Sequence, residues 1–208
     1  MADLAALTAA IEAGDRASAT AITREAIDEG LAPDVILAAM TAAMDEVGRR
    51  FSANEIYVPE MLISARAMKE STALLEPLLA AAGIRPEFTA VIGTVKGDLH
   101  DIGKNLVAMM WRGANIEVVD LGANVPPERF VEAAKEHGAQ LVGLSALLTT
   151  TMVGMKDVVT AIAAARLPAK VIVGGAPLTQ AFADQIGADG YAPDAASAVE
   201  VATRLARA

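Results

Sequence analysis

A short apolar run and a polar loop stand side by side near the middle of the chain: Thr89-Ala90-Val91-Ile92-Gly93-Thr94-Val95, then Lys96-Gly97-Asp98-Leu99-His100-Asp101-Ile102-Gly103-Lys104-Asn105. The first run predicts a buried strand, and a helical pattern follows the second. His100, one of only two histidines, therefore lies in a strand-to-helix loop, where open α/β sheets bind their ligands. Asp98 can accept a hydrogen bond from one imidazole nitrogen and leave the other as a basic metal ligand. Gly103 lets the backbone approach a bulky ligand.

The alternation of a short apolar run with a helical stretch continues to the end of the chain. The predicted strands are Ala90–Val95, Ile116–Leu121, Leu141–Leu147, Lys170–Val173 and a weaker Gly190–Ala192. Five such units with nearly continuous apolar strands predict a parallel sheet covered by helices on both faces. A flavodoxin-like (Rossmann-type) strand order is the preferred topology, although local patterns do not encode the order itself.

The N-terminal part of the chain has a different period. Apolar residues recur at three- and four-residue steps in four segments, which predicts four helices. Their expected boundaries are Gly14, Asp15, Gly30, Pro33 and Pro59, residues that end, cap or open helices. The connector Ala82–Pro86 is rich in helix breakers. We therefore expect a helical cap domain over residues 1–85 and an α/β domain over residues 86–208.

Composition excludes several classes of protein. The 208 residues are 54% hydrophobic, contain no cysteine and carry a net charge of −9, which argues against a nucleic-acid surface. No apolar run reaches the roughly 18 residues that span a membrane, and the N-terminus lacks the pattern of a signal peptide. The absence of cysteine fits a cytoplasmic protein. We expect neither nucleic acid nor a membrane as partner.

Two further strand ends carry small residues that could complete a ligand site. Ser145 ends the third predicted strand, and Gly174-Gly175 closes the fourth. Together with the His100 loop they would leave room for a long, flat, partly apolar group. Ordinary alternatives stay open, because a serine can simply end a strand and a glycine pair can form a turn. Neither a P-loop nor a Gly-x-Gly-x-x-Gly sequence is present.

Several stretches together resemble one known family. They are Gly93–Asn105, Val119–Gly122, Gly48–Phe51, Ile56–Leu62 and Ser64–Lys69. The Asp-x-His-x-x-Gly motif and its surroundings resemble the cobalamin module shared by methionine synthase and the corrinoid proteins of methyltransferase systems. The remaining three stretches are similar to that family's helical cap. The resemblance covers essentially the whole chain.

The resemblance implies roles for individual residues. His100 would be the lower cobalt ligand and Asp98 its hydrogen-bonding partner, with Thr151 at the place of the family's serine. Phe51 and Val58 would shield the upper face of the cofactor, Val58 more thinly than the leucine of methionine synthase. The expected cofactor-binding set is Phe51, Val58, Asp98, His100, Asp101, Gly103, Ser145, Leu147, Thr149, Thr151, Gly174 and Gly175, with His100 as metal ligand and no catalytic residue. Ser145, Thr149 and Gly174 would contact the nucleotide tail.

The function implied by the resemblance is that of a methyl carrier with no catalysis of its own. The cobalamin would be bound base-off, with histidine as the lower ligand of its methyl-Co(III) form. Its Co(I) form, which tends to lose that ligand, would accept a methyl group from a substrate:corrinoid methyltransferase. A second methyltransferase would pass it to tetrahydrofolate or coenzyme M, and a reductive activating protein would serve as a further partner. An adenosylcobalamin- or methylcobalamin-binding sensor is the alternative, although a DNA-binding helix-turn-helix and a cap tryptophan are lacking. An adenosylcobalamin mutase module and a cofactor-free α/β interaction domain are weaker alternatives.

Overall fold

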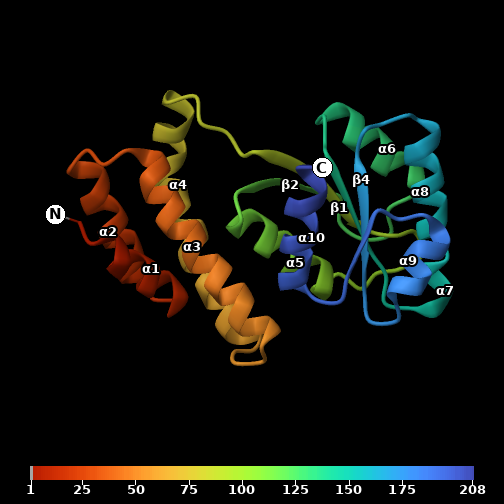
Figure 1. Ribbon diagram of the computed structural model, residues 1–208, viewed down its shortest axis with the longest axis horizontal. Helices are drawn as coiled ribbons and strands as arrows, with labels where there is room; N and C mark the ends of the chain where they lie inside the picture. The colour runs from red at the N-terminus through yellow and green to blue at the C-terminus, as the bar shows by residue number, and fades with distance from the viewer. Residues whose placement is uncertain (1) are drawn as a thin grey trace. The chain divides into compact units, whose positions relative to one another are not determined.

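A computed structural model describes residues 2–208, and the chain divides into two compact units (Figure 1). One unit contains the residues up to Pro86, with the short segment Gly113–Asn115 grouped with it. The other contains Glu87–Arg112 and Ile116–Ala208. The first is helical and the second is an α/β sheet, as the two sequence periods predict.

The helical unit consists of four helices whose ends follow the predicted signals. They are α1 (Leu4–Glu12), α2 (Arg16–Asp28), α3 (Pro33–Ser52) and α4 (Val58–Ala81). Asp15 caps α2, because its side chain accepts a hydrogen bond from the main-chain N–H of Ser18. Helix α4 begins at Val58, one residue before the expected Pro59. Within residues 2–208, no helix has the length and apolar character needed to cross a membrane.

Four methionines contribute to the core of the helical unit. Met40, Met44, Met61 and Met68 are all buried and serve as packing residues. Phe51 and Val58 differ from them, since both are only partly buried.

The second unit is a five-stranded parallel sheet in the order β2-β1-β3-β4-β5, which confirms the flavodoxin-like topology. Its strands are β1 (Phe88–Thr94), β2 (Ile116–Asp120), β3 (Leu141–Ser145), β4 (Lys170–Gly174) and β5 (Gly190–Ala192). The prediction that the third strand reaches Leu147 was wrong. Strand β3 ends at Ser145 because the main-chain N–H of Leu147 turns away and donates to a side chain of another loop.

Helices cover both faces of the sheet (Figure 1). They are α5 (Ile102–Gly113), α6 (Pro127–Glu136), α7 (Thr149–Met152), α8 (Met155–Ala164), α9 (Gln180–Ile186) and α10 (Ala195–Ala206). One apolar cluster joins the sheet to α6, α8 and α9, and a second joins it to α5 and α10. Trp111 is fully buried in the second cluster, and its Nε1–H donates to the carbonyl of Ala198 at 2.9 Å.

The strand order of the sheet reverses at β1, because successive strands are added first on one side of β1 and then on the other. Strand β2 pairs with one side of β1 and β3 with the other. The loops after β1 and β3 therefore lie next to each other at the switch point, which is where ligands bind in sheets of this type. Thr94 of β1, Ser145 of β3 and Gly174 of β4 are register partners along this edge.

Candidate functional site

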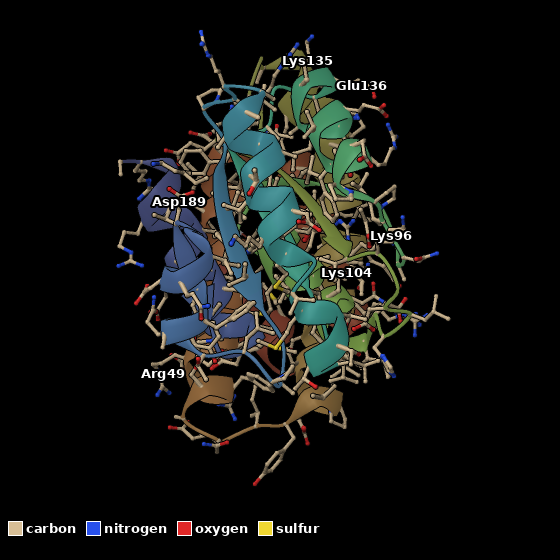
Figure 2. All side chains as sticks on the ribbon, turned by 90° about the vertical axis from the view of Figure 1, so that its right-hand side faces the viewer. Arg49, Lys96, Lys104, Lys135, Glu136 and Asp189 are labelled. Carbon is tan, nitrogen blue, oxygen red and sulfur yellow. The ribbon has the colours of Figure 1, made fainter. Side chains whose placement is uncertain are left out.

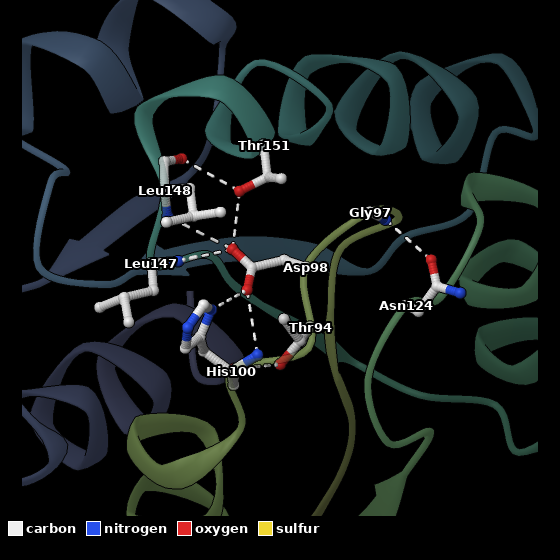
Figure 3. Close-up of polar contacts among 8 residues, drawn as sticks. All are labelled: Thr94, Gly97, Asp98, His100, Asn124, Leu147, Leu148 and Thr151. Atoms are coloured by element: carbon white, nitrogen blue, oxygen red, sulfur yellow. Dashed lines mark hydrogen bonds and ion pairs between the residues drawn. The ribbon is translucent and has the colours of Figure 1, made fainter.

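The carboxylate of Asp98 joins the two loops at the switch point (Figure 3). Its Oδ1 accepts hydrogen bonds from the main-chain N–H of His100 at 3.0 Å and from the ring Nδ1 of His100 at 2.7 Å. Its Oδ2 accepts from Thr151 Oγ1 at 2.6 Å. The main-chain N–H groups of Leu147 and Leu148 donate to the same oxygen at 2.8 and 3.3 Å. Asp98 is fully buried, so these donors replace the water that it has lost.

These hydrogen bonds set the protonation of the pair. Burial, the strongest single influence on Asp98, raises the pKa of its carboxyl. Hydrogen bonds from Thr151, from the main chain of His100 and Leu147, and from the His100 ring together outweigh burial and hold this pKa well below its ordinary value. Asp98 is therefore ionised at neutral pH. Because an ionised carboxylate only accepts hydrogen bonds, the proton of the ring contact lies on Nδ1 of His100.

The same geometry leaves the second ring nitrogen of His100 available. Within residues 2–208, no hydrogen bond involves Nε2, and the side chain is 52% exposed. Thr94 Oγ1 donates to the carbonyl of His100 at 3.1 Å, which holds the histidine backbone against the end of β1. An imidazole with its Nδ1–H bonded to a carboxylate is the usual arrangement of a histidine metal ligand. His100 can therefore offer an oriented and accessible Nε2 to a metal.

The loops at this end of the sheet expose several large apolar side chains. Leu99 and Ile102, close to His100 in the chain, are 75% and 76% exposed. Leu147, Leu148 and Val153, which lie just before and just after α7, are also exposed. Exposed apolar patches of this kind mark binding surfaces. A flat, largely apolar macrocycle with a metal at its centre fits this combination of an oriented imidazole and exposed apolar side chains.

The glycines of the site differ in what they permit. A Cβ at Gly103 would meet no atom within 4 Å, so this face of α5 is open. A Cβ at Gly174 would lie 3.1 Å from the carbonyl oxygen of Ala192, and one at Gly175 would lie 1.9 Å from that of Ala146. Gly175 also has a φ of +140°, which strongly favours glycine. The glycine pair is thus required in part by the fold itself.

Two polar residues of the predicted site, Asp101 and Thr149, form no hydrogen bond with Asp98. Asp101 makes no side-chain hydrogen bond among residues 2–208, and its carbonyl accepts from the Asn105 N–H at 2.8 Å. Thr149 is an exposed residue at the start of α7. Phe51 and Val58 belong to the helical unit. Sequence reasoning did not include Leu99, Ile102, Leu148 or Val153; apolar residues placed in polar loops were the signal that could have revealed them.

The class of protein follows from this fold and site together with comparisons to known proteins. A family model described as a B12 binding domain matches residues 88–200, and a second model of the same description matches residues 4–76. The structure also resembles that of the methanol:cobalamin methyltransferase complex of Methanosarcina barkeri. The TM-score is 0.87 at 29% identity, covering 98% of this chain and 80% of that one.

Relatives narrow the class further. A corrinoid protein of Desulfitobacterium hafniense is 40% identical over 205 residues, covering 96% of this chain and 95% of the relative. Dimethylamine corrinoid protein 3 of Methanosarcina acetivorans is 42% identical over 197 residues, covering 94% and 88%. The chain belongs to the cobalamin-binding corrinoid proteins of methyltransferase systems, as its motifs predicted.

Proposed function

We propose that this protein is a methyl carrier that binds cobalamin base-off, with His100 as the lower cobalt ligand. The chemistry that the cofactor supplies is reversible carriage of a methyl group on its cobalt. The observation that supports the proposal best is the Asp98 network, because it orients the ring of His100 and leaves Nε2 free beside an exposed apolar surface.

The residues of the α/β unit would divide the work of holding the cofactor. His100 would ligate the cobalt through Nε2, and Asp98 would keep the proton on Nδ1 while the hydroxyl of Thr151 holds Asp98 in place. Leu99, Ile102 and the exposed apolar residues of the loop after β3 would exclude water from the bound cofactor. The nucleotide tail would pass along the edge formed by Ser145, Thr149, Gly174 and Gly175.

The helical unit, residues 1–85, would act as the cap over the face that carries the methyl group, and residues 86–208 would hold the cofactor. Phe51 and Val58, which are only partly buried, would face that group and keep water and oxygen away from it. A cap of this kind has to move aside for partner enzymes to reach the cofactor. The boundary Gly83–Pro86 is the expected hinge.

We propose a substrate:corrinoid methyltransferase as the donor partner and a second methyltransferase, acting on tetrahydrofolate or coenzyme M, as the acceptor partner. A reductive activating protein would restore the cofactor after oxidation. The 42% identity to a dimethylamine corrinoid protein supports a methylated amine as the methyl donor. Holoprotein whose cobalamin carries no methyl group is first reduced to the Co(I) state with a low-potential chemical reductant and then incubated with each candidate methyltransferase and its substrate. Mass spectrometry of the bound corrinoid identifies the donor by the methyl group that it has gained.

The ligand assignment is tested by the visible spectrum of the bound cofactor. His100→Ala should still bind methylcobalamin but show the spectrum of cofactor without a nitrogen lower ligand. His137→Ala is the matched control, because His137 is an exposed residue at the end of α6 and should leave the spectrum unchanged. A wild-type spectrum from fully loaded His100→Ala would remove His100 from the site.

A further inference from the structure

The loop that carries His100 is held from the side of β2 as well as from the side of β3. Asn124, in the loop between β2 and α6, has a φ of 58°, a left-handed conformation that asparagine tolerates. Its side-chain Oδ1 accepts the N–H of Gly97 at 2.8 Å (Figure 3). Its own main-chain N–H donates to the carbonyl of Asp98 at 2.9 Å. The backbone of Gly97 and Asp98 is therefore fixed on both sides by one residue.

The far end of the same loop is also tied to the end of β2. Lys104, in the first turn of α5, has a side chain only 1% exposed, in contrast to Lys96, which extends into solvent (Figure 2). Its Nζ donates to both carboxylate oxygens of Asp120 at 2.6 Å and to Asn105 Oδ1 at 2.7 Å. Oδ1 of Asp120 in turn accepts the N–H of Gly122 at 2.9 Å.

We propose that Asn124 and the Lys104–Asp120 ion pair are positioning residues for the cobalt ligand. Asn124 holds the loop before His100, at Gly97 and Asp98, and the Lys104–Asp120 ion pair holds it after His100. Both contacts attach the loop to the segment Asp120–Asn124. The Asp98 contacts with the loop after β3 fix the side chain of Asp98, but they do not fix the backbone that presents it. The inference rests on the proposed role of His100.

The positioning role makes a prediction that a purely structural role does not. A residue that only stabilises the fold changes the free energy of unfolding and leaves the ligation state of the folded protein alone. A residue that aims His100 changes the fraction of bound cofactor that carries the nitrogen ligand. A metal ligand held slightly out of place loses bonding, since a site needs its supporting contacts to keep its geometry.

The test uses Asn124→Gly, because glycine retains the left-handed backbone and the main-chain N–H but lacks the Oδ1 acceptor. In protein loaded with methylcobalamin, the ratio of nitrogen-ligated to unligated cofactor, read from the visible spectrum, should fall roughly three- to ten-fold, the worth of one hydrogen bond. Asn124→Asp, which retains an acceptor oxygen, should restore the ratio. Asn115→Gly is the matched control, since Asn115 has the same φ of 58° and precedes β2 at its other end.

A second measurement does not involve the cofactor. In cobalamin-free protein, Asn124→Gly should speed hydrogen exchange at the Gly97 amide, and Asn115→Gly should not. An unchanged ligation ratio in folded Asn124→Gly would overturn the inference for Asn124. If the wild-type protein shows no nitrogen ligation, both the proposed function and this inference fail. If the wild-type protein shows nitrogen ligation and Asn124→Gly keeps it unchanged, only the inference fails.

The ion pair is tested as a pair, because removal of one partner would leave a buried charge and could unfold the protein. Lys104→Met combined with Asp120→Leu removes both charges. This double variant should lower the nitrogen-ligated fraction at least as far as Asn124→Gly does. A folded double variant with the wild-type ratio would overturn the role of the ion pair.

Discussion

Thr151 Oγ1 lies 2.6 Å from Oδ2 of Asp98, although the two residues are 53 positions apart in the chain. This hydrogen bond ties the loop after β3 to the loop after β1, across the place where the sheet reverses its order. The resemblance to the family implies a serine at this position, and the hydroxyl of the threonine found here reaches the carboxylate. Its methyl group leaves the contact intact.

Removal of that hydroxyl should destabilise the cobalamin-free protein. Thr151→Val should lower the free energy of unfolding by about 1–3 kcal/mol, the cost of losing a hydrogen bond to a charged group. Thr151→Ser retains the hydroxyl and should cost well under half as much. Urea unfolding of the three proteins measures the difference. An equal loss in both variants would mean that the methyl packing of Thr151, and not its hydroxyl, matters.

The low pKa of Asp98 makes stability depend on pH in a defined direction. A carboxyl whose pKa is lower in the folded than in the unfolded protein stabilises the fold above the unfolded-state value, about 3.9. That contribution is lost as the pH falls through and below this value toward the lower folded-state pKa. The gap in free energy of unfolding between wild type and Asp98→Asn should therefore be widest near pH 7 and narrow below about pH 4. A gap independent of pH would contradict the ionised state of Asp98.

Substitution of Gly103 should have opposite effects on stability and on cofactor affinity. A Cβ there meets nothing within 4 Å, and glycine is a weak helix former, so Gly103→Ala should stabilise the cobalamin-free protein by up to about 1 kcal/mol. The same methyl group should lower cobalamin affinity if the cofactor lies against this face of α5. Thermal unfolding and equilibrium titration with cobalamin measure the two effects. Affinity equal to that of wild type would place the cofactor away from Gly103.

Gly174 is a less clean probe of the same site. We expect Gly174→Val to lower cobalamin affinity, but its side chain would also press on the Ala192 carbonyl, 3.1 Å from the Cβ position. Part of its effect would therefore be lost stability. Measurement of both the free energy of unfolding and the cobalamin affinity of Gly174→Val, beside the same pair of values for Gly103→Ala, separates lost stability from blocked cofactor binding.

The cap residues should control access to the bound methyl group. Phe51→Ala should speed photolysis of bound methylcobalamin several-fold without abolishing binding, because a large apolar side chain is lost. Val58→Leu should slow photolysis slightly by thickening the shield. Phe88→Ala is the control, since Phe88 is the first residue of β1 and lies at the end of the strand away from His100. Equal rates in all four proteins would make Phe51 and Val58 ordinary packing residues.

Much of the fold could be predicted from local patterns in the sequence. Helix ends such as the Asp15 cap, the apolar β runs and the strand-to-helix place of His100 all depend on residues within one turn or strand of each other. Local signals of this kind do not depend on tertiary contacts, because side-chain type alone carries them. The Asp98–His100 pair belongs to this group, because its members are two residues apart.

The rest of the site was decided only by tertiary structure. The main-chain N–H groups of Leu147 and Leu148 hold Asp98, yet every residue but proline has such a donor and no side chain signals it. The burial of Lys104 and the clamp at Asn124 depend on β2 lying beside β1. That neighbourhood is set by the order of strands in the sheet, which depends on how whole layers pack and is not encoded in any short stretch of residues.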